Sequence, residues 1–452
     1  MAGVLDYNYG YQFSSTLNTR GLHWAAMRPL QRSFIVESSV DGQFFAGKLS
    51  HPQVVCRMLS VLSRVVRTHF FEPMPPNRDP VVTSSPTTLR WEGFSGCCGV
   101  YSRIDLDGNA FESCVPGFGT TNVDFNPEML SHLTRVGPSD SLEFQISVDA
   151  VSVRRDDETV TERKVALPHR WIKGFGEVQA YQSRLKAEQE FSARLLSRFL
   201  QTLPRQSSGQ RYLIVQKTGL RQSTREQPGS ILVGGIDRLK VLTPLLPDAT
   251  NVRVWGDRGS GTTGWQIDLP AGRFWLVLSP ELYRGFSGEG QILTSLADGR
   301  GKDIVDDVQN LITNQATIDP AEIAAQLGAA VADVQHALMA LSVQGLAGFD
   351  ADSGLYFHRE LPFALDTVES SQPRLKGARK LVATGDVKVV ATHDDHTQDV
   401  EVHSYGTLYF VKLRPAGDRC NCPWFGRYQG ERGPCKHVLA ARIFVDEQKG
   451  QD

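Results

Sequence analysis

The chain has 452 residues, of which 40% are hydrophobic and 22% charged, a balance typical of folded globular domains. The length exceeds what one ordinary core supports, so roughly two to four domains are expected. A formal charge of −2 gives no general attraction to nucleic acid, and no apolar run is long enough to span a membrane.

The first residues lack a basic region followed by an apolar stretch, so no secretory signal is predicted. The chain contains seven cysteines, and three of them lie close together near the C-terminus. An odd number of cysteines, a metal-like cluster and no secretory signal together predict a reducing, cytoplasmic compartment.

Residues 1–205 alternate strand-like and helix-like patterns, which predicts a mixed α+β domain. Strands are expected at 32–38 and from Gln43, and Pro52 begins a helix whose apolar residues recur every three or four positions. A longer helix is predicted over 177–203. Its apolar stripe is formed by Phe191, Leu195, Phe199 and Leu203.

Residues 206–290 are predicted to be a β-rich domain, either separate from the first or continuous with it. Strands are expected around 211–215, 252–255 and 273–278. The glycine-rich run 256–264 lacks the Lys that a phosphate loop needs, and it lies between two strands rather than before a helix. It is therefore predicted to be a hairpin turn. No internal repeat is visible.

Residues 291–365 change to a helical pattern. A helix near 302–314 precedes a second helix with Pro320 in its first turn and Gly328 at its end. A third helix is predicted over 331–344, followed by a hairpin at 346–358. This order resembles a winged helix-turn-helix.

The last domain is predicted over 375–452, with strands followed by a helix from Lys436. Cys420 and Cys422 are separated by twelve residues from Cys435 and His437. Three thiolates and one imidazole complete a tetrahedral zinc shell and leave no position for water or substrate, so one structural zinc ion is predicted. The positive end of the final helix should favour the Cys435 thiolate.

This C-x-C-x(n)-C-x-H spacing, with strands before it and a helix after it, resembles the SWIM zinc finger, here as a ββα module. The resemblance covers about residues 385–445, and the segment Trp171–Gln179 is similar to one in long bacterial SWIM-finger proteins. Proteins of that kind resemble those encoded beside MoxR-type ATPases and von Willebrand A-domain proteins, so such a protein is the partner that the resemblance implies.

Residues 405–444 contain seven basic and two acidic residues, a net charge of 7 − 2 = +5, and aromatic residues interleave with them. This mixture suits a protein-binding surface or stacking on nucleic-acid bases, and the aromatic residues would otherwise form a small core over the zinc. The predicted contact residues are Arg419, Trp424, Phe425, Arg427, Tyr428, Arg432 and Lys436.

Residues 301–360 contain two basic and nine acidic residues, a net charge of 2 − 9 = −7. The third helix, which would read DNA in a winged-helix protein, contains no Lys or Arg. A DNA reader needs cations that neutralise phosphates. This unit is therefore predicted to contact protein or to pack within the chain.

No catalytic constellation is visible, and no small-molecule substrate is indicated. Cys97, Cys98 and Cys114 have no histidine beside them, and His393, His396 and His403 are expected to be solvated. The sequence therefore predicts a non-enzymatic zinc-binding adaptor that contacts a protein partner. A DNA- or RNA-binding protein that uses the basic finger is the alternative, and a hydrolase built on the N-terminal domain is a more distant one.

Overall fold

The computed structural model divides the chain into two units, residues 1–39 and 40–452. In the first unit β1 (Leu17–Asn18) pairs with β2 (Gly21–Leu22), and the strand predicted at 32–38 lies outside the described residues. The described residues are 17–18, 21–22, 42–68, 80–167, 169–204, 209–280, 285–288, 290, 292–293, 301–361, 372–415, 417–430 and 432–449.

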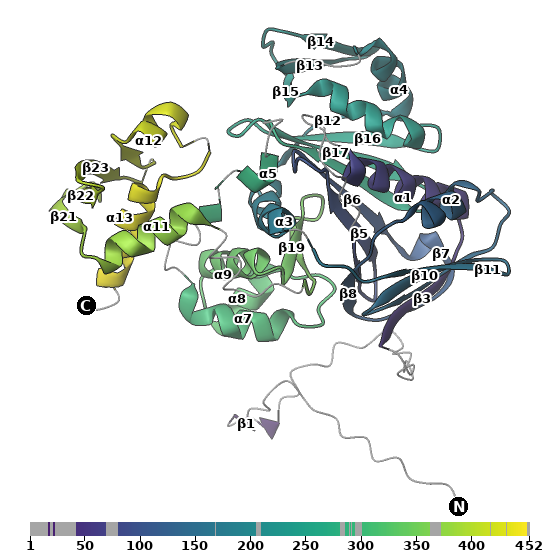
Figure 1. The fold of residues 1–452 in the computed structure, drawn as a ribbon, viewed down its shortest axis with the longest axis horizontal. Coiled ribbons are helices and arrows are strands. Elements are labelled where there is room, and N and C mark those ends of the chain that lie inside the picture. Colours follow the sequence, from purple (N-terminus) through teal and green to yellow (C-terminus); the bar gives the residue numbers. More distant parts are fainter. Residues whose placement is uncertain are drawn as a thin grey trace, which may run out of the picture. The chain divides into compact units, whose positions relative to one another are not determined.

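The second unit begins with a strand and a helix that follow the predicted pattern (Figure 1). The first strand is β3 (Gln43–Leu49), and α1 (Pro52–Arg67) begins with Pro52 at its first turn, where a missing N–H is tolerated. β3 lies inside a five-stranded sheet in the order β11-β10-β9-β3-β7. The other strands are β7 (Phe111–Pro116), β9 (Leu142–Ser147), β10 (Ala150–Arg155) and β11 (Glu158–Arg163).

An eight-stranded sheet has the order β12-β16-β17-β18-β6-β5-β4-β8. This sheet contains strands from both sides of residue 205, because β18 pairs with β6 in antiparallel register, with Leu278 opposite Val100. The domain boundaries drawn from the sequence remain predictions. The strands are β4 (Val81–Ser84), β5 (Leu89–Phe94), β6 (Val100–Leu106), β8 (Gly119–Asn122), β12 (Lys186–Ser192), β16 (Asn251–Asp257), β17 (Thr262–Leu269) and β18 (Gly272–Leu278).

The order of elements repeats between residues 42–167 and 186–280. A strand and a helix come first, a group of strands follows, and a second helix and a three-stranded meander end each half. The opening strand pairs with the first meander strand in both, β3 with β9 and β12 with β16. The sequence shows no repeat because such an arrangement requires only similar alternation of apolar residues. The helices are α2 (Pro127–Thr134), α4 (Ala193–Thr202) and the 3-10 helix η2 (Ile236–Leu245).

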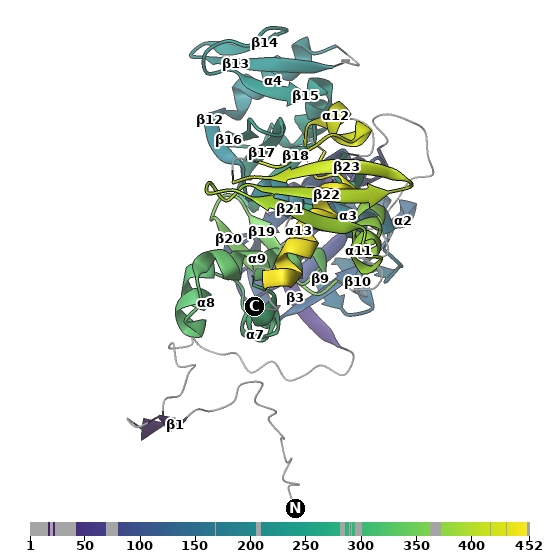
Figure 2. The same cartoon turned by 90° about the vertical axis from the view of Figure 1, so that its left-hand side faces the viewer.

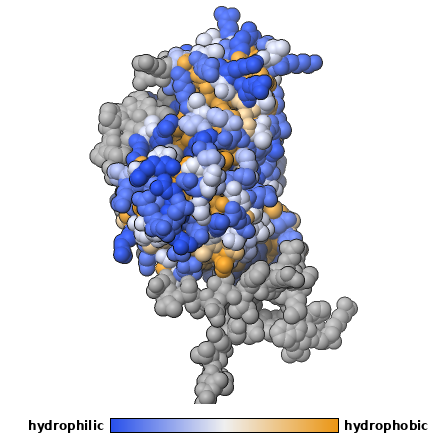
Figure 3. All heavy atoms as spheres, turned by 90° about the vertical axis from the view of Figure 1, so that its right-hand side faces the viewer, coloured by the Kyte–Doolittle hydropathy of each residue, from blue (hydrophilic) through white to orange (hydrophobic). Residues whose placement is uncertain are grey.

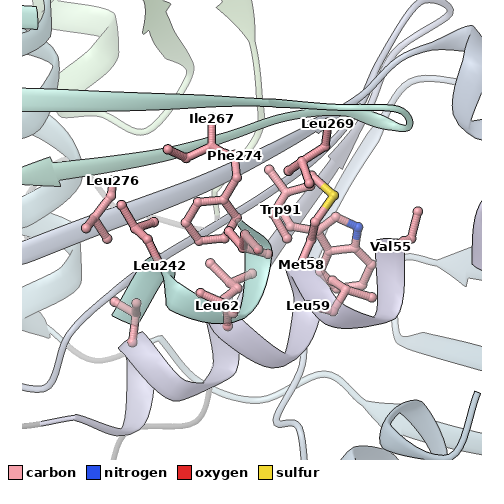
Figure 4. Packing of buried hydrophobic residues seen from close by; sticks show 14 of the residues in the cluster. Val55, Met58, Leu59, Leu62, Trp91, Leu242, Ile267, Leu269, Phe274 and Leu276 are labelled. Atoms are coloured by element: carbon pink, nitrogen blue, oxygen red, sulfur yellow. The ribbon is translucent and has the colours of Figure 1, made fainter. Parts of the chain in front are cut away.

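One hydrophobic core joins both halves. Figure 4 shows Met58, Leu59 and Leu62 of α1 packed toward Trp91 and toward Phe274 of β18. These side chains are at most 1% exposed. Because the two halves share this core, we expect them to fold as one unit rather than as two separate domains.

The prediction of one continuous helix over 177–203 is wrong. The structure has α3 (His169–Gln182), then strand β12, and then α4. Lys186–Ser192 consists of residues with ordinary helix propensity, but its backbone pairs with β16, with Phe191 opposite Val252. A long-range ladder outweighs local propensity here, which the sequence pattern does not show.

Helix α3 accounts for the segment Trp171–Gln179 as a packing element. A Cβ at Gly174 would lie 3.1 Å from the Phe94 ring, and one at Gly176 would lie 3.3 Å from the Val343 backbone. Both positions therefore favour a residue without a side chain. Gln179 is fully buried and accepts a hydrogen bond from the backbone N–H of Phe349.

Residues 301–361 form what we call the helical unit. The second main helix ends at Gly328, as predicted, and Gly328 adopts the left-handed conformation. Asp319 caps the N-terminus of this helix by accepting a hydrogen bond from the Ala321 N–H. The winged-helix assignment itself remains a prediction. The elements are a short η3 (Lys302–Ile304), α7 (Val305–Ile312), α8 (Pro320–Leu327), α9 (Val331–Val343), β19 (Ala347–Asp350) and β20 (Leu355–His358).

Buried ion pairs hold the β19–β20 turn against the large sheet. Arg103 of β6, whose side chain is fully buried, donates to Asp350 at 2.5 Å and to the Phe349 carbonyl at 3.0 Å. Asp352 pairs with Arg253 and Arg273. Burial alone would raise the pKa of Asp350, but Arg103 and neighbouring arginines hold it well below its usual range.

Residues 372–449 form the finger domain. Its antiparallel sheet has the order β21-β22-β23-β24, and Figure 2 shows the first three of these strands side by side, with α12 near one end. A separate hydrophobic core fills this domain and also includes Leu293. The elements are α11 (Pro373–Ala383), β21 (Val387–Thr392), β22 (Gln398–Ser404), β23 (Thr407–Leu413), β24 (Arg419–Cys420), α12 (Pro423–Tyr428) and α13 (Lys436–Lys449).

Hydrophilic residues predominate on the face of the molecule drawn in Figure 3, with apolar residues in scattered groups between them. Among the described residues, no helix combines the length and apolar character needed to cross a membrane.

Candidate metal centre

The four predicted zinc ligands come together at one place in the finger domain. Cys420 ends β24, Cys422 precedes α12, and Cys435 and His437 lie at the start of α13. Their exposed fractions are 8%, 2%, 2% and 4%, respectively. Each of the four ligand atoms lies within 4.8 Å of the others. The end of strand β24 and the starts of helices α12 and α13 therefore assemble the site.

These separations fit a tetrahedral zinc shell. Zn–S bonds of about 2.3 Å and Zn–N bonds of about 2.0 Å put sulfur and nitrogen ligands about 3.6 Å apart. The Cys420 Sγ lies 3.9 Å from the His437 Nδ1. The donor set and its spacing position Cys420, Cys422, Cys435 and His437 to bind one zinc ion.

Backbone N–H groups favour the thiolate form of two ligands. The Phe425 N–H donates to the Cys422 Sγ at 3.4 Å, and the Val438 N–H donates to the Cys435 Sγ at 3.4 Å. Each N–H belongs to the first turn of a helix, where the helix dipole also favours negative charge. The helix start expected to favour the Cys435 thiolate is therefore present, and a second helix start favours the Cys422 thiolate in the same way.

The three thiols influence one another within the protein. Hydrogen bonding from the Cys420 thiol lowers the pKa of Cys422, and the same contact raises the pKa of Cys420. One of the three thiols is therefore readily deprotonated, whereas three thiolates side by side require a divalent cation to balance their negative charge. Zinc supplies that charge, which couples metal binding to the release of protons.

The His437 ring is held by stacking. Its plane lies 18° from that of the Tyr409 ring, with the ring centroids 4.0 Å apart. Its Nε2 is buried and has no hydrogen-bond partner among the described residues. Histidine ligands are commonly oriented by a hydrogen bond at the second nitrogen. Tyr409 takes over that orientation here. No pattern in the sequence indicates this role for Tyr409.

The predicted contact residues divide into two groups. Phe425 is 9% exposed and belongs to the core beneath the zinc, and Trp424 packs against that core. Arg427 and Arg419 are exposed on the described surface and have no acidic partner there. The Lys436 ammonium bonds to the Ser404 hydroxyl at 2.7 Å.

An aromatic pair surrounded by arginines forms the surface of the zinc loop. The Trp424 and Tyr428 rings lie 4.5 Å apart. The Arg427 and Arg432 guanidiniums lie 5.2 Å and 5.3 Å from the Tyr428 ring centre. Arg374 of α11 covers Trp424 at 4.7 Å.

Arg374 also holds the loop in place, a role that no spacing in the sequence indicates. Its guanidinium donates to the carbonyls of Arg432 at 2.8 Å and Pro434 at 2.9 Å. The only signal in the sequence is the cluster of basic residues at 374–380. No spacing rule connects that cluster with the zinc loop, because the contact is tertiary.

Among the described residues, these four ligands form the single Cys/His/acidic group with metal-binding spacing. Cys97, Cys98 and Cys114 do not assemble into a second group. His393 lies 2.9 Å from Asp399 on the sheet surface. The glycine-rich run 256–264 forms the β16–β17 hairpin, as predicted.

Residues 409–442 match the SWIM zinc finger family model. A search of curated proteins finds no match. Among solved structures, the Proliferating Cellular Nuclear Antigen of Entamoeba histolytica matches with a TM-score of 0.38 and 10% identity over 53% of this chain and 99% of that chain. A PCNA2–PCNA3 complex of Sulfolobus tokodaii matches with a TM-score of 0.39 and 12% identity over 52% of this chain and 99% of that chain. Likeness at these TM-scores supports no conclusion about function.

Proposed function

We propose that this chain is a non-enzymatic adaptor whose zinc finger contacts a protein partner. The observation that carries the proposal is the surface of the zinc loop, where Trp424 and Tyr428 lie among Arg374, Arg427 and Arg432. Trp, Tyr and Arg are the residue types that dominate binding hot spots between proteins.

The zinc shell supports a structural rather than catalytic metal. All four positions of a tetrahedral shell are supplied by side chains that are at least nine-tenths buried. Catalytic zinc sites keep one position for water or substrate. In this proposal the metal holds α12 and α13 in the arrangement that presents the loop.

The partner proposed is a MoxR-type ATPase or a von Willebrand A-domain protein, on the strength of the resemblance to long bacterial SWIM-finger proteins. The positive charge of the finger favours an acidic surface on that partner, because complementary charge speeds encounter and selects orientation.

Biolayer interferometry with the purified full chain and purified candidate partners from the same genome tests this proposal. Tyr428→Ala and Arg427→Glu should each weaken binding about tenfold without loss of zinc. Lys388→Glu, at an exposed position of β21, is the control for the charge change and should leave binding within about twofold. Absence of binding to either candidate would exclude these partners, and equal losses in all three variants would exclude the loop as the contact.

Nucleic-acid binding is the second candidate function. The net charge of +5 over residues 405–444 favours it, as does the stacking of arginines on aromatic rings. Fluorescence anisotropy with a twenty-nucleotide thymidine strand between about 50 and 200 mM salt tests it, because each phosphate contact steepens the salt dependence. Charge reversal at Arg427 and Arg432 should then reduce both the affinity and the slope. Salt-independent or absent binding would reject this function.

A further inference from the structure

A groove of about 420 Å³ opens in the helical unit between α8, α9 and the β19–β20 hairpin. Ligand sites in proteins are commonly about 300 to 1,000 Å³. Pro320 and Met339 contribute apolar wall, and no Lys or Arg lines the groove. The zinc loop contributes no residue to it, so the groove is separate from the finger surface.

Two aromatic rings form the floor of the groove. Phe349 and Tyr356 lie edge to face, with ring centroids 5.0 Å apart. Tyr356 is only 5% exposed, but its hydroxyl is not one of the fully buried atoms, and it has no hydrogen-bond partner among the described residues. The hydroxyl can therefore bond to water or to a ligand in the groove. Burial also raises the pKa of Tyr356 to about 12, so the hydroxyl stays neutral at physiological pH.

The polar groups of the groove are suited to accept hydrogen bonds. The Nδ1 of His336 lies 2.7 Å from the Ala332 carbonyl. A carbonyl oxygen only accepts, so Nδ1 carries a proton in this contact. The Gln335 amide and the Ser183 hydroxyl also line the groove and can accept.

The charge around the groove selects a cation. Residues 301–360 contain nine acidic residues, of which Asp350 and Asp352 are paired with arginines of the large sheet. Arg359, one of the two basic residues in this range, is buried in an ion pair with Glu92 at 2.7 Å. Asp319 precedes Pro320 at the groove, and Asp333 lies one turn before His336 on α9. Aromatic rings, acceptors and acidic neighbours together recognise ammonium and guanidinium groups.

We propose that this groove binds a basic peptide segment of a protein partner and places an Arg or Lys side chain against the Phe349–Tyr356 floor. The apolar walls take the neighbouring side chains of the segment. The proposal does not depend on which molecule contacts the zinc finger, because the two surfaces share no residue.

Fluorescence anisotropy with the full chain and a labelled peptide, Gly-Arg-Leu-Arg-Lys-Leu-Gly, tests the proposal. A matched peptide with Glu in place of each Arg and Lys should not bind. Gln335→Arg places a like charge in the groove and should weaken binding of the basic peptide about tenfold or more. Gln309→Arg makes the same change at an exposed position of α7 outside the groove lining, and salt screening should keep its effect below about threefold.

Tyr356→Phe removes only the hydroxyl and should weaken binding about threefold to tenfold. Tyr428→Ala on the zinc loop should leave it unchanged, which separates this site from the finger. Failure of the basic peptide to bind, equal binding of the acidic peptide, or equal losses in the two Gln variants would overturn the proposal. Urea unfolding of each variant shows whether a loss of binding reflects loss of fold.

Discussion

The zinc finger takes all four metal ligands from residues 420–437, whereas the helical unit is held by arginines far away in the sequence. Arg103 and Asp350, for example, are 247 residues apart. The finger has its own core and its own metal site, so its stability is mostly local. The helical unit has a core that includes Trp255 and Trp275 of the large sheet, so its stability is shared with the sheet. Loss of the finger should leave the rest folded, whereas damage to the ion pairs should lower the stability of the sheet and the helical unit together.

The largest effect is expected from Cys435→Ala. A structural zinc site contributes roughly 10–16 kcal/mol of binding free energy to folding, so the finger should lose both its metal and its fold. Elemental analysis should find one zinc per chain in the original protein and none in the variant, and limited proteolysis should cut within residues 372–449 alone. Cys114→Ala, at an exposed position of β7, is the control and should keep the zinc. Retention of zinc by Cys435→Ala would contradict the ligand assignment.

Asp350→Ala tests the other side of the comparison. It removes the closest carboxylate from the buried Arg103 guanidinium, which keeps Asp105 at 3.0 Å, and loss of one partner of a buried polar group costs about 1–3 kcal/mol. The free energy of unfolding from urea titration should fall by that amount while zinc content stays unchanged. Glu143→Ala removes the partner of the more exposed Arg154 and should cost at most about 1 kcal/mol. Similar losses of unfolding free energy in the two variants would show that the buried ion pair contributes no more to stability than the exposed one.

A smaller effect is expected from Tyr409→Leu. The variant removes the ring that stacks on His437, and loss of a group that orients a zinc ligand commonly weakens metal binding about tenfold or more. Competition with a chelator measures the zinc affinity. Phe410→Leu makes the same kind of change at the next residue, which is 52% exposed, and should leave the affinity unchanged. If both variants behave alike, stacking does not orient the ligand.

The smallest effect is expected from mild acid on the ion-pair network. The pKa of Asp350 is lower in the folded state than in the unfolded chain, so its contribution is complete above the unfolded pKa of about 3.9 and is lost as pH falls below it. Urea unfolding of the sheet and helical unit should therefore show little change from this pair between pH 7 and pH 5. Zinc affinity should fall over the same range because protons compete for the thiolates. A steep loss of sheet stability near pH 6 would contradict this assignment.

Several local features were predictable because their causes are local. Pro52 at the start of α1, the Asp319 cap and Gly328 at the end of α8 act through neighbouring backbone groups. The zinc ligands were also predictable, since their spacing is a property of the sequence itself. The short helix α12 was missed because six residues between two ligands show no usable periodicity.

The sequence by itself determined the identity of the zinc ligands, the main helices of the helical unit and the charges of the two surfaces. Only the tertiary structure decided that Lys186–Ser192 is a strand, that Arg103 meets Asp350, and that Arg374 covers Trp424. The physical reason is range. Caps, turns and metal-ligand spacing depend on residues a few positions apart, whereas sheet pairing and buried ion pairs depend on which distant segments share one core.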